Sequence, residues 1–168
     1  AAWSDIPLVV HFRGSDASAQ SRLGLLKERY RRLMEIVSGV IVKSQPMRRR
    51  LLVLGAPEDY LIVSPSGADD RLFHSADPGT AAPLFVAVGR FVAKKGPLET
   101  IQAFAAMRQT LPKSEAAKTN LVMVGDGPLL PRARELIEEL GLDSFVSLPG
   151  IAGREQVAAL FRKARCFV

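Results

Sequence analysis

The chain of 168 residues contains one cysteine, Cys166, and no long apolar run. A single cysteine excludes an internal disulfide, and no stretch approaches the roughly 18 consecutive apolar residues that a membrane-spanning helix needs. The first residues also lack the features of a secretory signal peptide. These absences predict a cytoplasmic protein in which Cys166 lies in a buried strand as a small hydrophobic residue.

Aromatic residues are also few, at 7% of the chain, whereas the net charge is +6. This excess of cations favours anionic partners. Six arginines of the first third fall on two predicted helices: Arg29, Arg31, Arg32, Arg48, Arg49 and Arg50. Because no aromatic residues are interleaved with them, nucleic acid is not expected as a partner. Two alternatives are left open for these arginines. They form a solvated helix face, or they make peripheral contact with anionic lipid at the inner face of the plasma membrane.

Two common phosphate-binding motifs are missing. A dinucleotide-binding fingerprint needs a third glycine three places after the second, but Leu130 stands at that distance from Gly127. A Walker loop needs Gly-Lys followed by Ser or Thr, whereas residues 95–97 read Lys-Gly-Pro. Neither NAD nor ATP is therefore expected. His74 has no companions that could ligate a metal, so no metal is expected either.

Short apolar runs alternate with helical patterns along the whole chain. Strands are expected at residues 6–12, 39–42, 60–63, 84–88, 121–124 and 145–148, and from 166 onward. Helices are expected between them, one capped by Ser44 and others starting at Pro97 and Pro128. This alternation predicts an α/β chain with parallel, doubly wound sheets.

The chain is predicted to contain parts of two domains. Residues 76–83 lack apolar periodicity and carry a Pro-Gly pair, which is typical of a linker. Residues 1–75 would then belong to the first domain and residues 84–168 to the second. The chain starts without methionine and stops inside an apolar run, so we expect a fragment that is truncated at both ends.

The strand at 84–88 ends in a cationic turn and opens into a helix at Pro97. Proline is favoured at the first helical position, where free amides and the positive end of the helix dipole attract anions. Two cations beside such a helix start suit a diphosphate better than a carboxylate. Arg90 and Lys95 are therefore predicted to bind a diphosphate, with a solvated turn as the alternative for Lys94 and Lys95.

Three segments of the second half resemble a known family: VGRFVAKKG, LVMVGDGP and GLDSFVSLPGI. They are similar to the C-terminal domain of retaining glycosyltransferases of family 4, the glycosyl transferases group 1, which have the GT-B fold. The segments HFRGSDAS, GVIVKSQPMRRRLLVLGAP and VSPSGADDRLF extend the resemblance over the first half. The resemblance implies the end of an acceptor domain followed by the first part of a donor domain, both Rossmann-like.

The resemblance also implies an activity. Such an enzyme transfers a sugar from a nucleotide-diphosphate sugar to a saccharide or lipid-linked acceptor with retention of configuration, here in bacterial surface-polysaccharide synthesis. Arg90 and Lys95 match the family's Gly-Arg-x(4)-Lys-Gly pattern, whose cations contact the donor diphosphate without a metal. The donor-site loops would contain Gly89, Gly125, Gly127 and Ile151. Of these, Gly125 and Gly127 are expected to shape the turn that follows the strand at 121–124.

The family's His-Gly-x-Asp turn corresponds to residues 13–16, where Arg13 replaces the histidine. Arg13 and Asp16 are therefore expected at the catalytic position, although an arginine cannot act as a base and would bind phosphate or acceptor instead. For Asp16 a cap of the following helix is the alternative left open. Three further residues are expected at the interdomain cleft: Gly14, Gly67 and Asp69.

The resemblance places a paired-glutamate segment just after Val168, and a fragment without it would be inactive. Two alternatives remain open at this point. One is a non-catalytic module that binds a nucleoside diphosphate, as the arginine at position 13 indicates. The other is a module that docks on membranes through its arginine clusters.

Overall fold

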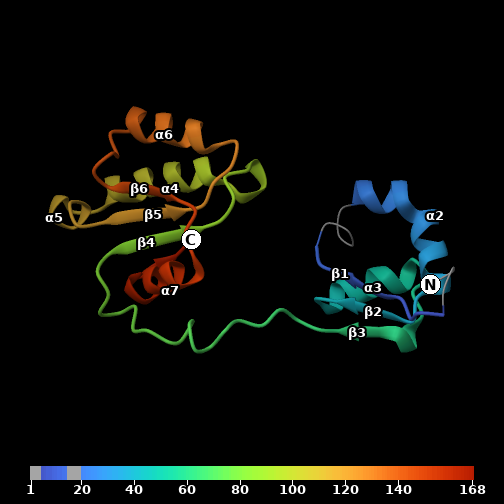
Figure 1. The fold of residues 1–168 in the computed structure, drawn as a ribbon. Coiled ribbons are helices and arrows are strands. Elements are labelled where there is room, and N and C mark those ends of the chain that lie inside the picture. The colour runs from blue at the N-terminus through green and yellow to red at the C-terminus, as the bar shows by residue number, and fades with distance from the viewer. Residues whose placement is uncertain (1–4, 15–19) are drawn as a thin grey trace. The chain divides into compact units, whose positions relative to one another are not determined.

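The computed structural model describes residues 5–14 and 20–168. Contacts between Cα atoms divide the chain into two compact units, one that ends at Ala68 and one that comprises Asp69–Val168. We call them unit 1 and unit 2. Each unit is a parallel sheet with helices packed on it (Figure 1). No helix among the described residues is long and apolar enough to cross a membrane.

Unit 1 contains three parallel strands in the order β1-β2-β3, which comprise Val9–Phe12, Gly39–Val42 and Leu61–Val63. Helices α2 (Gln20–Ile36) and α3 (Gln45–Val53) connect them. The core is formed by apolar residues of the strands, of both helices and of the turns that follow the helices: Phe12, Met34, Val37, Val40, Val42, Met47, Leu51, Ala56 and Leu61. The alternation of apolar runs and helical patterns thus predicted these elements correctly.

Local sequence sets the limits of α3 as expected. The hydroxyl oxygen of Ser44 accepts a hydrogen bond from the amide of Met47 at 3.4 Å, and Pro46 lies in the first turn. Gly55 follows the helix at φ +89°, a value that glycine adopts without strain. The first strand is shorter than predicted, because β1 pairs with β2 only from Val9 onward and Ile6 is exposed.

Unit 2 contains a four-stranded parallel sheet in the order β6-β5-β4-β7. The strands comprise Leu84–Val88 (β4), Asn120–Val124 (β5), Val146–Gly150 (β6) and Cys166–Phe167 (β7). The chain adds β5 and β6 on one side of β4 and then returns to place β7 on the other side. The strand order therefore reverses between β4 and β7. In open parallel sheets, ligands bind at the carboxyl ends of the strands at such a point.

The helices of unit 2 cover both faces of its sheet (Figure 1). Helices α4 (Pro97–Thr110) and α6 (Leu130–Glu139) pack together on one face, and α7 (Arg154–Lys163) packs against β4 on the other. The short helix α5 (Lys113–Ala116) precedes β5. The core between the sheet and the paired helices contains these buried residues: Phe91, Ile101, Phe104, Leu121, Met123, Ala133, Leu136, Ile137, Leu142 and Val146.

An arginine fixes the amino-terminal edge of this sheet. The Arg108 guanidinium donates hydrogen bonds to the carbonyl oxygens of Ala116 and Thr119, the latter at 2.6 Å. It also lies 3.4 Å from the centre of the Phe145 ring, which is a cation–π contact. Partial burial lowers the pKa of Arg108 from its ordinary value. The residue thus joins α4, α5 and the start of β6.

Three sequence predictions differ from the structure. Pro128 lies in a turn, and Pro131 instead occupies the first turn of α6. The third strand of unit 2 runs from Val146 to Gly150 rather than over 145–148. Cys166 is exposed and not buried, because β7 pairs only with β4.

The connecting segment, which we define as residues 69–83, spans the domain boundary predicted from sequence. Sequence placed the first domain up to residue 75 and a linker at 76–83. In the structure the contact boundary falls between Ala68 and Asp69. The guanidinium of Arg165 donates to the carbonyl oxygen of Ala81, so even the predicted linker is attached to unit 2.

Candidate functional site

A pocket of about 270 Å³ lies at the carboxyl end of β4, where the strand order reverses. Its lining comes from the turn after β4, from the start of α4 and from the end of β7. The residues that matter for its chemistry are Gly89, Arg90, Lys95, Pro97, Phe167 and Val168. The two cations predicted from sequence to bind a diphosphate thus line one pocket.

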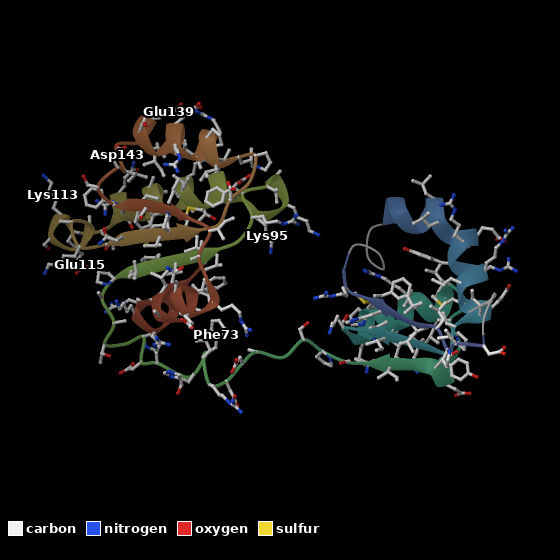
Figure 2. The ribbon with its side chains drawn as sticks, viewed as in Figure 1. Phe73, Lys95, Lys113, Glu115, Glu139 and Asp143 are labelled. Atoms are coloured by element: carbon white, nitrogen blue, oxygen red, sulfur yellow. The ribbon has the colours of Figure 1, made fainter. Side chains whose placement is uncertain are left out.

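The turn after β4 presents these cations because a residue between them is anchored in the core. Phe91 is only 2% exposed, whereas Arg90 and Lys95 are exposed. A short 3₁₀ helix, Ala93–Lys95, follows, and Gly96 at φ +59° redirects the chain into α4. Figure 2 shows Lys95 extending from this turn. Burial of the phenylalanine therefore leaves both charged side chains facing the pocket.

The pocket is electrostatically suited to an anion. No acidic residue is among the described residues that line it, and within the described part of the chain the side chains of Arg90 and Lys95 form no hydrogen bond or ion pair. Pro97 occupies the first position of α4, so the positive end of the helix dipole points toward the same region. Two cations and a helix start can together neutralise more than one phosphate group.

A second turn, residues 125–129, supports the first, which comprises residues 89–96. A Cβ atom on Gly125 would lie 1.9 Å from the carbonyl oxygen of Gly89, and one on Gly127 would lie 2.6 Å from that of Phe91. Both glycines have positive φ, +143° and +154°. The amide of Phe91 donates to the carbonyl oxygen of Asp126 at 2.9 Å. The glycines of the second turn thus pack against the first turn, and they are not among the residues that line the pocket.

The other predicted site residues lie elsewhere. Ile151 is 81% exposed and borders a separate pocket beside Pro149 and Gln156. Arg13, Gly14 and Gly67 belong to unit 1, and Asp69 begins unit 2 with its carboxylate 3.9 Å from Arg154. Asp16 lies outside the described residues. Among the described residues no group of three or more His, Cys, Asp or Glu could hold a metal ion.

Sequence reasoning missed part of the pocket lining. Thr100, Met123, Phe167 and Val168 all border the pocket. No local motif marks them, because their contribution depends on packing: Met123 lies on β5 beside β4, and Phe167 and Val168 line the pocket because β7 pairs with β4 on its other side. The signal that could have found them is the order of the strands, which the sequence alone does not give.

Comparison with known proteins identifies the family. The family model described as "Glycosyl transferases group 1" matches residues 70–168. The chain belongs to this family. It is also 27% identical over 159 residues to a putative colanic acid biosynthesis glycosyltransferase, WcaL, of Salmonella typhimurium. That match covers 94% of this chain but 38% of the relative, so the chain spans about two fifths of the length of the curated relatives it matches.

Solved glycosyltransferase structures share the fold. The chain superposes on Anabaena Alr3699/HepE, solved with UDP and glucose, with a TM-score of 0.64 and 21% identity over 91% of this chain and 44% of that one. A glycosyltransferase of Rickettsia africae gives a TM-score of 0.67 and 19% identity over 97% and 45% of the two chains. The predicted fold class, an α/β chain with Rossmann-like parallel sheets of the GT-B type, is confirmed.

Proposed function

We propose that the chain is part of a glycosyltransferase and that the pocket of unit 2 binds the diphosphate of a nucleotide-sugar donor. The observation that carries this proposal is that Arg90, Lys95 and the start of α4 line one pocket where the strand order reverses. Membership of the glycosyl transferases group 1 family supports it, and so does the UDP bound to the Anabaena neighbour.

The proposed chemistry follows from the donor. When the bond between the anomeric carbon and the phosphate oxygen breaks, the electron pair stays on that oxygen and the nucleoside diphosphate leaves as an anion. Cations and helix amides that face this oxygen lower the energy of the transition state. Arg90 and Lys95 supply the cations, Arg90 with a planar fork that can bind two phosphate oxygens at once. We include in the proposal that no metal is needed.

The acceptor and the stereochemistry are finer parts of the proposal. The motif resemblance favours transfer with retention to a saccharide or lipid-linked acceptor, and the colanic acid relative favours a role in bacterial surface-polysaccharide synthesis. Arg13, which is exposed at the end of β1, would bind phosphate or acceptor. Turnover of the full-length enzyme that is unchanged by EDTA would support the metal-free part, and loss of turnover would contradict it.

The central experiment measures binding and not turnover. The melting temperature of the full chain is recorded with and without UDP, and separately GDP, because a ligand that binds only the folded state raises it. We expect one nucleotide to raise it and the double variant Arg90→Ala/Lys95→Ala to abolish the rise. Lys94→Ala is the matched control, because Lys94 is exposed in the same turn without lining the pocket. A rise that survives in the double variant contradicts the proposal.

A second candidate function is docking on an anionic membrane through α3. Arg49 and Arg50 are exposed, and within the described residues their side chains have no hydrogen-bond or ion-pair partner. They border a shallow groove with Pro46 and Val53, and Val53 is 87% exposed. Cations around exposed apolar atoms suit anionic lipid, to which each cation adds about 1 kcal/mol. Binding to phosphatidylserine vesicles should be lost in Arg49→Ala/Arg50→Ala and kept in Arg90→Ala/Lys95→Ala.

The remaining alternative is a module that binds a nucleoside diphosphate without catalysis, which the arginine at position 13 favours. It predicts that nucleotide binding is present but that turnover of the full-length protein does not rise in Arg13→His. A gain in turnover would exclude this alternative.

A further inference from the structure

The connecting segment is attached along α7 and the residues that follow it. The Arg162 guanidinium donates to the carbonyl oxygen of Leu72 at 3.4 Å, and Arg165 donates to that of Ala81 at 3.1 Å. These bonds hold only backbone atoms of the segment. They fix its course on unit 2 without specifying what its side chains do.

Phe73 is the aromatic residue of this segment, in a stretch that is otherwise mostly small or polar. It is half-buried, and Figure 2 shows it beside α7. Its ring centre lies 6.1 Å from that of Phe161 on this helix. The ring of Phe161 in turn meets that of Phe167 at 5.2 Å in an edge-to-face arrangement. Three rings therefore form a continuous row from the connecting segment through α7 to β7.

The end of this row is a wall of the candidate diphosphate pocket. Phe167 lines the pocket that Arg90 and Lys95 line. Its backbone is paired with Val86 of β4, whose carbonyl oxygen accepts a hydrogen bond from the amide of Val168 at 2.9 Å. Its side chain is 59% exposed, so contact with the Phe161 ring is an important constraint on its orientation. A loss of order in Phe161 would therefore be transmitted to the pocket wall.

We propose that Phe73 is a positioning residue for the diphosphate pocket: it orients Phe161 and, through it, the Phe167 wall. This inference rests on the proposed function, since it concerns the same pocket. According to this inference the connecting segment contributes to ligand binding by unit 2, although Phe73 does not line the pocket itself. By reciprocity, ligand in the pocket should in turn stabilise the connecting segment.

The test compares affinity with stability in matched variants. Dissociation constants for UDP and GDP are measured by calorimetry in the full chain, together with urea unfolding. Phe73→Ala should weaken nucleotide binding by about 3- to 10-fold, which corresponds to the loss of an aromatic pair contact. Phe73→Tyr, which keeps the ring, should restore affinity. Phe73→Leu is the second variant, for the case that the alanine variant does not fold. Leucine keeps most of the apolar volume but lacks the ring, so this variant should fold and still bind nucleotide more weakly.

Phe145→Ala is the matched control. Phe145 is also a half-buried aromatic residue of unit 2, but its contact is with Arg108 at the amino-terminal edge of the sheet. This variant should lose stability and keep nucleotide affinity, which separates positioning from general destabilisation. Equal affinities of wild type and Phe73→Leu would overturn the inference and leave the proposed function standing. Absence of UDP and GDP binding in the wild type would overturn both.

A second readout tests the reciprocal effect. Hydrogen exchange of residues 69–81 should slow when the binding nucleotide is added to the wild type. In Phe161→Ala, in which the row of rings is interrupted, the nucleotide should no longer slow it. Equal protection in both proteins would overturn the inference.

Discussion

The two strand-turn-helix connections of unit 2 differ in what they present to the pocket. The first turn carries Arg90 and Lys95 and lines the pocket. The second turn is built around Gly125 and Gly127, whose missing side chains make room for the backbone of the first. The two turns look alike in sequence, since each follows an apolar strand and contains glycine and precedes a helix. The first turn is the proposed ligand site, and the second packs against it.

This difference teaches that a glycine-rich turn at the edge of a parallel sheet is not by itself a phosphate site. At Gly125 the space that a side chain would need is occupied by the protein itself, since a Cβ atom there would lie 1.9 Å from a backbone carbonyl oxygen of the first turn. The cations of the first turn, by contrast, have no partner within the described residues. Where the protein itself fills the space, glycine is structural, and where charges are left unpaired, a ligand is expected.

The largest effect on stability and nucleotide binding should come from a substitution in the second turn, which packs against the first. Gly125→Ala introduces a Cβ atom against the first turn at a backbone dihedral that alanine adopts only with strain. We expect it to lower the free energy of unfolding of unit 2 by about 3 kcal/mol and to remove nucleotide binding as well. Urea unfolding measures the first effect and thermal shift with nucleotide the second.

Gly67→Ala is the control for this substitution. Nothing lies within 4 Å of a Cβ atom at Gly67, and its φ is not positive. The change should leave the stability within about 0.5 kcal/mol of the wild type. If Gly125→Ala were as harmless as Gly67→Ala, the second turn would not support the first.

A smaller effect is expected from changing the geometry of a charge while keeping its sign. Arg90→Lys retains one positive charge but loses the planar fork that can bind two phosphate oxygens. We expect nucleotide affinity to fall by about 10-fold, as measured by calorimetry, with unchanged stability because the residue is exposed. An affinity equal to that of the wild type would show that Arg90 acts as a point charge only.

Next in size is the internal hydrogen bond of the second turn. The carboxylate of Asp126 accepts a hydrogen bond from the amide of Gly127 at 2.7 Å. Asp126→Ala should lower the free energy of unfolding by about 1 kcal/mol, with a smaller loss of nucleotide affinity. A larger loss of affinity than of stability would indicate that the second turn also contacts the ligand, which would weaken the contrast between the turns.

The smallest effect should arise on α6, the helix that follows the second turn. Hydrogen bonds and the charge of Arg132 lower the pKa of the exposed Glu139 carboxyl. Since the pKa is lower in the folded state, the stabilisation is present above the ordinary carboxyl pKa and is lost as the pH falls through the lowered value. Urea unfolding from about pH 7 down to about pH 3 should show a slightly greater loss in the wild type than in Glu139→Gln. Nucleotide affinity at neutral pH should not differ between them.

Much of the fold could be predicted from local patterns. The strand at Gly39–Val42, the cap at Ser44, the strand at Leu84–Val88 and the proline at the start of α4 all agree with the structure. Each depends on interactions within a few residues. The errors fall where longer contacts decide. Cys166 is exposed because β7 pairs with one neighbour only among the described strands. The course of the connecting segment also depends on long contacts, since arginines beyond residue 160 bind its carbonyl groups.

The candidate site divides in the same way. The sequence alone determined that Arg90 and Lys95 flank a helix that begins at Pro97, since charge, spacing and the preference of proline are local properties. Only the tertiary structure decided that β7 lies on the other side of β4, that Phe167 therefore borders the same pocket, and that the ring of Phe161 contacts those of both Phe73 and Phe167. Strand order and ring contacts between residues some 90 positions apart, such as Phe73 and Phe161, depend on how the whole chain packs. No short stretch of sequence contains that information.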